Sequence, residues 1–124
     1  TPYIAFPFAL NKLTHSKTRY ALFRELYDEE QDIQLGGVTT EWLAAAHQAM
    51  NKIENSAGAI TTPTLVLSAD DDAIIDNKRQ RLVAQRMPNA TLEIVPRAYH
   101  ELFTESDDIR ERSLTRILDF LTES

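Results

Sequence analysis

Two stretches in the second half of the chain have the hydrophobic pattern of β-strands. Residues 64–68 contain the continuous apolar run Leu65, Val66 and Leu67, which is typical of a strand covered on both faces, as in a parallel sheet. Residues 91–95 alternate between polar and apolar side chains, which indicates a strand nearer the sheet edge. The second half of the chain therefore predicts a small sheet.

Apolar residues at helical spacing predict helices before, between and after these strands. Thr14 or Ser16 can cap the first helix, and Thr39 or Thr40 the second, because a side-chain oxygen at this position accepts a hydrogen bond from a free backbone amide. Pro88 ends the third, since its ring disfavours helical geometry in the residue before it. The expected helices cover about residues 14–27, 39–55, 77–87 and 107–122.

The remaining segments have the composition of loops. Residues 1–12 combine aromatic and apolar side chains with two prolines, and the acidic run at residues 28–32 breaks the helical pattern. Gly36 and Gly37 mark a turn. We therefore expect an entry loop, a solvated acidic loop and a turn ahead of the second helix.

The predicted elements divide the chain near residue 60. Residues 1–59 contain helices and loops, whereas residues 60–124 form a β-α-β-α unit whose two strands should run parallel. The fold class is therefore α/β. A chain of 124 residues is long enough for one domain with a modest hydrophobic core.

The charge balance argues against a nucleic-acid partner. Thirteen basic and nineteen acidic side chains give a formal net charge of −6, whereas phosphate binding requires a basic surface. The absence of cysteine excludes disulfides and thiolate metal ligands and is compatible with a cytoplasmic protein. No apolar run approaches the length of a bilayer span.

Two side chains suited to catalysis follow the two predicted strands. Asp72 belongs to the acidic triplet after the first strand, and His100 lies in the loop after the second. Functional groups in open parallel sheets gather beyond the carboxyl ends of the strands, so both loops should open on the same rim. There an aspartate can accept the Nδ1–H of a histidine and leave Nε2 free to take a proton from a serine. The pattern predicts an acid–histidine pair.

Each of these residues also has a structural interpretation. An acidic cluster after a strand often serves only as a helix N-cap, and a single loop histidine is more often a surface or structural residue. The chain order, acid and then histidine at successive strand ends, favours the functional interpretation. Asp72 is preferred over Asp70 and Asp71 because the apolar residues 73–75 after it resemble the acid-loop continuation of α/β-hydrolases.

The other histidines are weaker candidates. His47 lies near the apolar face of a predicted helix, where a half-buried structural role is expected, and His15 lies beside a predicted helix cap. Neither has companions at metal-ligand spacing, so we expect no metal site and no cofactor. Trp42, Phe103 and the N-terminal aromatic residues could line a substrate pocket, although such side chains more often form core.

The sequence lacks the motif that carries the nucleophile of a hydrolase triad. The glycines are Gly36, Gly37 and Gly58, so no G-x-S-x-G motif can be written. A chain with the triad acid and histidine but no nucleophile would be the later part of an enzyme, and we expect it to be inactive alone. Its first strand would lack a neighbour on one side, so we also expect self-association through that exposed edge.

Several segments resemble a known enzyme family. Residues 13–20, Gly36 and Gly37 followed by Trp42, residues 60–77 and residues 97–102 are similar to bacterial lysophospholipases related to monoglyceride lipases. The resemblance covers nearly the whole chain. It implies that residues 60–124 are the C-terminal part of an α/β-hydrolase core, with two parallel strands and helices, and that residues 1–59 are a cap or lid segment and its return to the core.

The resemblance also implies an activity. It is that of a serine hydrolase that cleaves the acyl ester of a lysophospholipid and releases a fatty acid, with Asp72 as the triad acid and His100 as the general base and acid. Such enzymes associate peripherally with the bacterial inner membrane, so we expect a cytoplasmic protein that can bind this membrane at its surface. A monoacylglycerol lipase, a carboxylesterase or an aminopeptidase of the same fold stays open, as does a non-catalytic binding domain in which Asp72 caps a helix.

Overall fold

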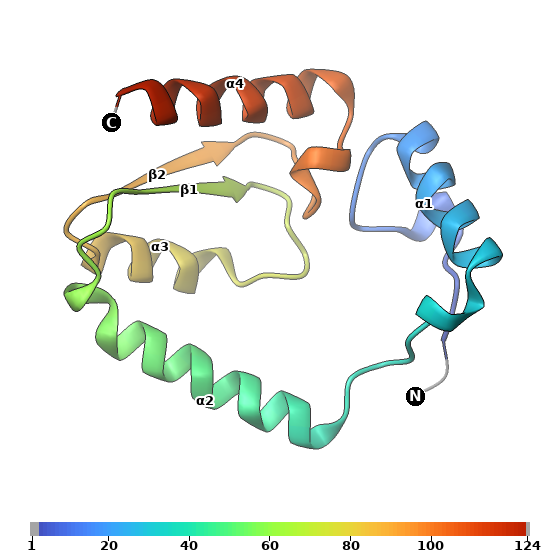
Figure 1. The fold of residues 1–124 in the computed structure, drawn as a ribbon, viewed down its shortest axis with the longest axis horizontal. Helices are drawn as coiled ribbons and strands as arrows, with labels where there is room; N and C mark the ends of the chain where they lie inside the picture. The colour runs from blue at the N-terminus through green and yellow to red at the C-terminus, as the bar shows by residue number, and fades with distance from the viewer. Residues whose placement is uncertain (1–2, 124) are drawn as a thin grey trace.

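A two-stranded parallel sheet forms the centre of the second half of the chain (Figure 1). The computed structural model describes residues 3–123, in which β1 is Thr64–Ala69 and β2 is Ala90–Val95. All six residues of each strand are paired in register. The predicted parallel strands are confirmed, while residues 1–2 and 124, the outer ends of the two expected segments, lie outside the described residues.

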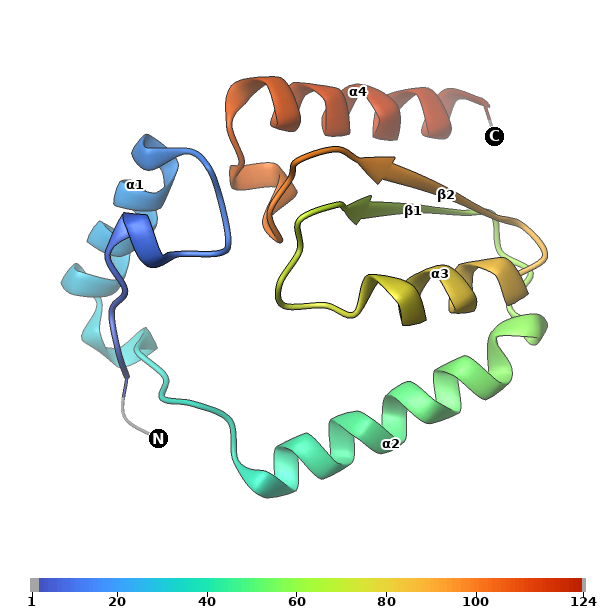
Figure 2. The same cartoon turned by 180° about the vertical axis from the view of Figure 1, so that it is seen from behind.

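Helices lie against both faces of this sheet (Figure 2). Helix α3, Asn77–Arg86, connects the strands on one face, and α4, Asp107–Glu123, follows β2 on the other. Leu65 and Leu67 line a pocket with α4, whereas Val66 lines one with α3, as expected for a strand with apolar neighbours on both faces. This cover is incomplete, because the first four residues of β1 remain half-buried.

The described part of the first half, residues 3–59, contains helices and no strand. Helix α1 is Lys17–Glu29, and its N-cap is Ser16, whose Oγ accepts the amide hydrogen of Arg19. Helix α2 is Thr40–Ser56, capped by Thr39. Short 3-10 turns occupy residues 8–10, 31–33, 57–59 and 102–104.

The acidic run after α1 is more ordered than predicted. Helix α1 continues through its first two residues, Asp28 and Glu29, and residues 31–33 form a 3-10 turn. Arg24 contributes to this extension because it pairs with Asp28 one helical turn later. The expectation of a plain loop over residues 28–32 was therefore wrong.

The buried core is small and lies near the carboxyl ends of the strands. Its main cluster consists of Ala69, Val95, Ala98 and Ile109, with Leu67 and Leu102 packed against it. The chain exposes 8847 Å², whereas a compact monomer of 14.1 kDa would expose about 6,700 Å². The excess includes the apolar face of α2, whose large side chains are about half exposed. None of the helices within residues 3–123 has the length and apolar character needed to cross a bilayer.

Candidate active site

The predicted acid and histidine meet beyond the carboxyl ends of the strands. Asp72 follows β1 after a short turn, and His100 follows β2 in the next loop. Nδ1 of His100 lies 2.9 Å from Oδ2 of Asp72. The Asp72 side chain is 8% exposed and that of His100 is 31% exposed, so the acid is sheltered while the imidazole is open to solvent on one side.

Backbone hydrogen bonds beyond the strands bring the two loops together. The amide of Asp70 donates to the carbonyl oxygen of Val95, and that of Asp71 donates to the carbonyl oxygen of Ala98, both at 3.0 Å. These bonds continue the pairing of β1 with β2 and place residue 72 beside the histidine loop. The side chains of Asp70 and Asp71 are exposed, so Asp72 is the member of the triplet that contacts His100.

The second oxygen of Asp72 is held by its own loop. Oδ1 accepts the amide hydrogens of Ile74 at 2.8 Å and Ile75 at 3.1 Å. Partial burial acts to raise the pKa of Asp72, but the hydrogen bonds from His100 and from the two amides outweigh it, and the pKa lies below its ordinary value. The ionised carboxylate accepts a hydrogen bond from the Nδ1–H group of His100, which leaves Nε2 of His100 available to exchange a proton.

A helix-capping role for Asp72 is contradicted by the structure. The N-cap of α3 is Asp76, whose Oδ1 accepts the amide hydrogens of Lys78 and Arg79 at 3.0 and 3.2 Å. Helix capping and histidine binding, which the sequence alone did not assign, are therefore carried out by different residues of this acidic stretch. Asp76 starts the helix, and Asp72 binds the histidine.

The loop that carries His100 begins with an unusual backbone turn. Arg97 has a φ of 60°, the left-handed conformation that non-glycine residues adopt infrequently. Directly after it, Ala98 is fully buried in the core, and His100 then lies at the rim. The turn thus directly precedes a buried anchor, Ala98, from which the chain leads to the partly exposed His100.

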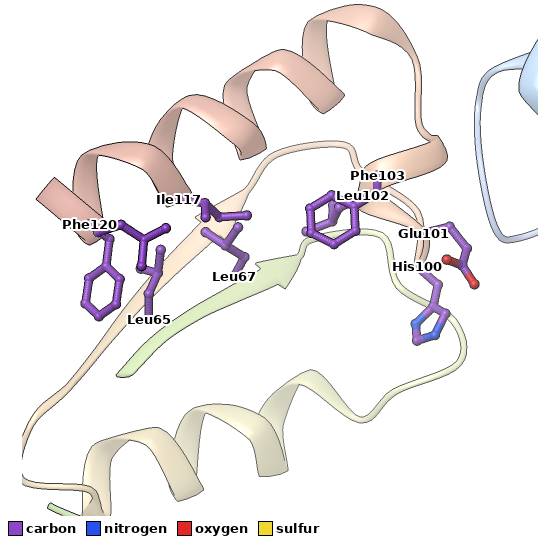
Figure 3. Close-up of a pocket in the computed structure, with 9 residues that line it drawn as sticks. Leu65, Leu67, His100, Glu101, Leu102, Phe103, Ile117 and Phe120 are labelled. Atoms are coloured by element: carbon purple, nitrogen blue, oxygen red, sulfur yellow. The ribbon is translucent and has the colours of Figure 1, made fainter. Parts of the chain in front are cut away.

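An apolar pocket of about 520 Å³ lies beside His100, between β1 and α4 (Figure 3). Its apolar lining includes Leu65, Leu67, Leu102, Phe103, Ile117 and Phe120. Phe103 is thus the aromatic candidate that lines the same pocket as the histidine. Trp42 lies on α2, and Phe6 and Phe8 lie beside α1, so neither group lines this pocket.

A second carboxylate–histidine pair, which the sequence did not predict, lies nearby. Nδ1 of His15 is 2.8 Å from Oε2 of Glu105, whose side chain is fully buried. The ring of His15 stacks on that of Tyr99, with centroids 3.8 Å apart and planes at 18°. Because Glu105 lies two residues before the start of α4, its sequence position suggested no more than an acid near a helix N-terminus.

His47, expected to be half-buried, is exposed on α2 in the structure, which describes residues 3–123. Over the same residues, no group of three or more histidine, cysteine, aspartate or glutamate side chains is arranged to hold a metal ion.

The chain is similar to known proteins over most of its length. A family profile described as serine aminopeptidase, S33, matches residues 2–107. Lysophospholipase L2 of Escherichia coli (strain K12) is 32% identical over 123 residues, which cover 94% of this chain and 36% of that protein. Probable lysophospholipase L2 of Haemophilus influenzae is 32% identical over 111 residues, 90% of this chain and 36% of that protein. The chain therefore spans about a third of the length of these curated relatives.

A solved structure shares the fold. A soluble variant of monoglyceride lipase from Saccharomyces cerevisiae, in complex with a substrate analog, superimposes with a TM-score of 0.68. The match covers 97% of this chain and 43% of the lipase chain, at 20% sequence identity.

Proposed function

Because this chain belongs to the serine aminopeptidase family, S33, and has part of an α/β-hydrolase fold, we propose that it carries the triad acid and histidine of a serine hydrolase. The proposed substrate is a lysophospholipid, whose acyl ester is hydrolysed to release a fatty acid. The observation that carries the proposal is the 2.9 Å contact between Nδ1 of His100 and Oδ2 of Asp72 at adjacent strand ends. The lysophospholipase names of the two bacterial relatives support the substrate class.

The proposed roles divide the chain into two segments. Residues 60–124 are the C-terminal part of the hydrolase core, and residues 1–59 are a cap or lid segment with its return to the core. In support, α1 lies near the rim that carries His100, and α2 leads from there back to the start of β1 (Figure 1). Hydrogen bonds and an ion pair join Arg79 and Arg86 of α3 to Glu54 of α2.

In the proposed reaction, Nε2 of His100 takes the proton of a serine hydroxyl as the serine oxygen attacks the ester carbonyl carbon. The imidazolium that forms is stabilised by Asp72 and returns its proton to the departing glycerol oxygen, which leaves an acyl-enzyme. His100 then takes a proton from water as the water oxygen attacks the acyl carbon, and it returns this proton to the serine oxygen as the acyl–serine bond breaks and the fatty acid is released. The serine and the oxyanion-hole amides would come from residues beyond these 124, since the sequence contains no G-x-S-x-G.

The substrate assignment is tested on the full-length protein that contains this chain. Lysophosphatidylethanolamine, a monoacylglycerol, a short-chain carboxylic ester and a peptide amide are compared at matched concentrations, and the highest kcat/KM is expected on the lysophospholipid. His100→Ala should abolish turnover of all four. A higher kcat/KM on another substrate would replace the lysophospholipid assignment, and full activity of His100→Ala would overturn the proposed triad.

The isolated 124-residue chain should not hydrolyse esters. Turnover of a chromogenic ester by the purified chain, abolished by a serine-directed phosphonate, would contradict this. The gene upstream of residue 1 offers an independent check: a G-x-S-x-G motif after a predicted strand favours the hydrolase, and an adjacent start codon favours a non-catalytic binding domain.

Two further proposals concern association. The edge of β1 away from β2 has no partner strand within the described residues, so the isolated chain should self-associate through it. Sedimentation velocity that detects a compact monomer alone at high concentration would refute this. For the full-length protein we propose a cytoplasmic location with peripheral binding to the inner membrane, which fractionation of cells would test.

A further inference from the structure

We infer that Glu105 is a positioning residue that helps to fix the orientation of His100, because it fastens Tyr99, the residue before the histidine, to the segment 13–15. The inference rests on the proposed function, because it concerns how the proposed catalytic histidine is held against Asp72. Glu105 itself touches none of the proposed reacting atoms.

The carboxylate of Glu105 collects five hydrogen bonds from three separate segments. Oε1 accepts hydrogen bonds from the amides of Ser106, at 2.8 Å, and His15, and from the hydroxyl of Thr14 at 3.1 Å. The Thr14 hydroxyl shares its hydrogen with the carbonyl oxygen of Thr104 at 2.7 Å. Oε2 accepts hydrogen bonds from Nδ1 of His15 at 2.8 Å and from the amide of Tyr99 at 3.0 Å. The side chain is 0% exposed, and a buried carboxylate needs this number of donors to compensate for its lost hydration.

These contacts bracket His100 along the chain. The amide of Tyr99 donates to Glu105, and the amide of Glu101 donates to the carbonyl oxygen of Leu13 at 2.9 Å. The ring of Tyr99 also stacks on His15. The backbone before and after the histidine is therefore tied to the same N-terminal segment, which fixes the position from which the His100 side chain projects.

A second tether joins the same parts of the chain. Nη1 of Arg19 donates to the carbonyl oxygen of Glu105 at 2.7 Å, and Nη2 pairs with Asp107 at 2.8 Å.

Burial acts to raise the pKa of Glu105, but the hydrogen bonds from Tyr99, His15 and Ser106 outweigh it, and the pKa lies below its ordinary value. The carboxylate thus stays ionised at neutral pH and keeps its full capacity to accept hydrogen bonds.

The link to catalysis is geometric. The Asp72–His100 hydrogen bond joins two loops, and Glu105 holds one of them. A shift of about 1 Å in a group that positions the reacting atoms can reduce the rate about 10²-fold. Loss of the Glu105 charge should therefore slow the chemical step while leaving substrate binding largely intact.

The test uses Glu105→Gln in the full-length enzyme, with lysophosphatidylethanolamine as substrate. The amide of glutamine keeps one acceptor oxygen and places a donor among the remaining donors. We expect kcat to fall about 10- to 100-fold and KM to stay within about twofold. The matched control is Glu111→Gln, on an exposed position of α4, which should leave both constants unchanged.

A double mutant separates positioning from general stability. If Glu105 acts through the Asp72–His100 pair, Asp72→Asn with Glu105→Gln should be no slower than Asp72→Asn alone. If the kcat losses of the two single variants multiply in the double variant, Glu105 acts independently of the Asp72–His100 pair. A lower Tm with unchanged kcat per folded molecule would show a purely structural role. Either result would overturn the inference. Should Glu105→Gln fail to fold, His15→Phe keeps a ring against Tyr99, removes one hydrogen bond to Glu105 and is tested by the same criterion.

The outcomes also distinguish this inference from the proposed function. Full activity of Asp72→Asn would defeat the proposed triad itself. An inactive Asp72→Asn, together with unchanged kcat in Glu105→Gln and His15→Phe, would leave the triad standing and defeat the role of Glu105.

Discussion

Two carboxylates in this chain each bind Nδ1 of a histidine, but they do so in different surroundings. Asp72 is 8% exposed and holds His100 with one oxygen and two neighbouring amides with the other. Glu105 is 0% exposed, and its five donors come from segments up to 91 residues away in sequence. The distances to the two imidazoles, 2.9 and 2.8 Å, are almost the same.

The surroundings rather than the contact therefore distinguish the two pairs. Asp72 is held by its own loop at the rim of the sheet, where His100 can still meet a second reactant. Glu105 uses its acceptor capacity to join three parts of the chain, and its histidine serves as one of several donors. The Asp72–His100 pair lies at adjacent strand ends, where functional groups of parallel sheets gather, whereas the carboxylate of Glu105 is buried and binds amides from three segments.

The largest effect that separates the pairs should come from Asp72→Asn. In the full-length enzyme we expect kcat to fall about 10⁴-fold, because asparagine favours the wrong tautomer of His100 and does not stabilise its charge. Asp70→Asn and Asp71→Asn are matched controls, since both side chains are exposed, and each should keep kcat within about threefold. Steady-state kinetics on one lysophospholipid measures all three. A loss in either control as large as that of Asp72→Asn would move the proposed acid.

For the free energy of unfolding we expect the opposite order: removing Glu105 should destabilise the protein more than removing Asp72. Glu105→Ala leaves buried donors of three segments without an acceptor and should lower the free energy of unfolding by about 3 kcal/mol or more. Asp72→Ala, at the rim, should lower it by about 1 kcal/mol. Urea unfolding of both variants under identical conditions gives the comparison. Equal losses would mean that burial and donor number do not separate the pairs.

Glu105 should also contribute to the pH dependence of stability. Hydrogen bonds lower its pKa in the folded protein, so the folded state binds fewer protons than the unfolded state at acidic pH. Its contribution is present above the ordinary glutamate pKa and is lost as the pH falls through the lower folded value, with each unit of lowering equivalent to about 1.4 kcal/mol. Tm measured between pH 6 and about 3 should therefore fall less steeply in Glu105→Gln than in Glu111→Gln. Parallel curves would contradict this contribution.

The rim pair could be predicted from the sequence because a general rule places it. The apolar run at residues 65–67 and the alternation at 91–95 identify two strands, and parallel strands carry their following loops to one rim. The starts of α1 and α2 could also be predicted from local sequence, since the side chains of Ser16 and Thr39 each accept an amide hydrogen bond from the first turn of the helix. No knowledge of distant contacts was needed for any of these features.

The second pair could not be predicted, because no local pattern encodes it. His15 and Glu105 are 90 residues apart and lie outside the regular part of any helix or strand, so neither periodicity nor register relates them. The exposure of α2 was missed for a related reason. An apolar face at residues such as Met50 and Ile53 predicts burial, but the sequence does not say whether the covering surface belongs to the same stretch of chain.

The smallest expected effect concerns the two contacts of His15. His15→Phe keeps an aromatic ring on Tyr99 but loses the hydrogen bond to Glu105, and should lower the free energy of unfolding by about 1 kcal/mol. His15→Ala loses the stacking as well and should lower it by about 1 kcal/mol more. Urea unfolding of both variants, with Lys12→Ala as an exposed control on the same segment, resolves the two steps. Equal losses in both variants would mean that the stack on Tyr99 adds no stability, and the hold on the His100 loop would then depend on the hydrogen bonds of Glu105 and Leu13 alone.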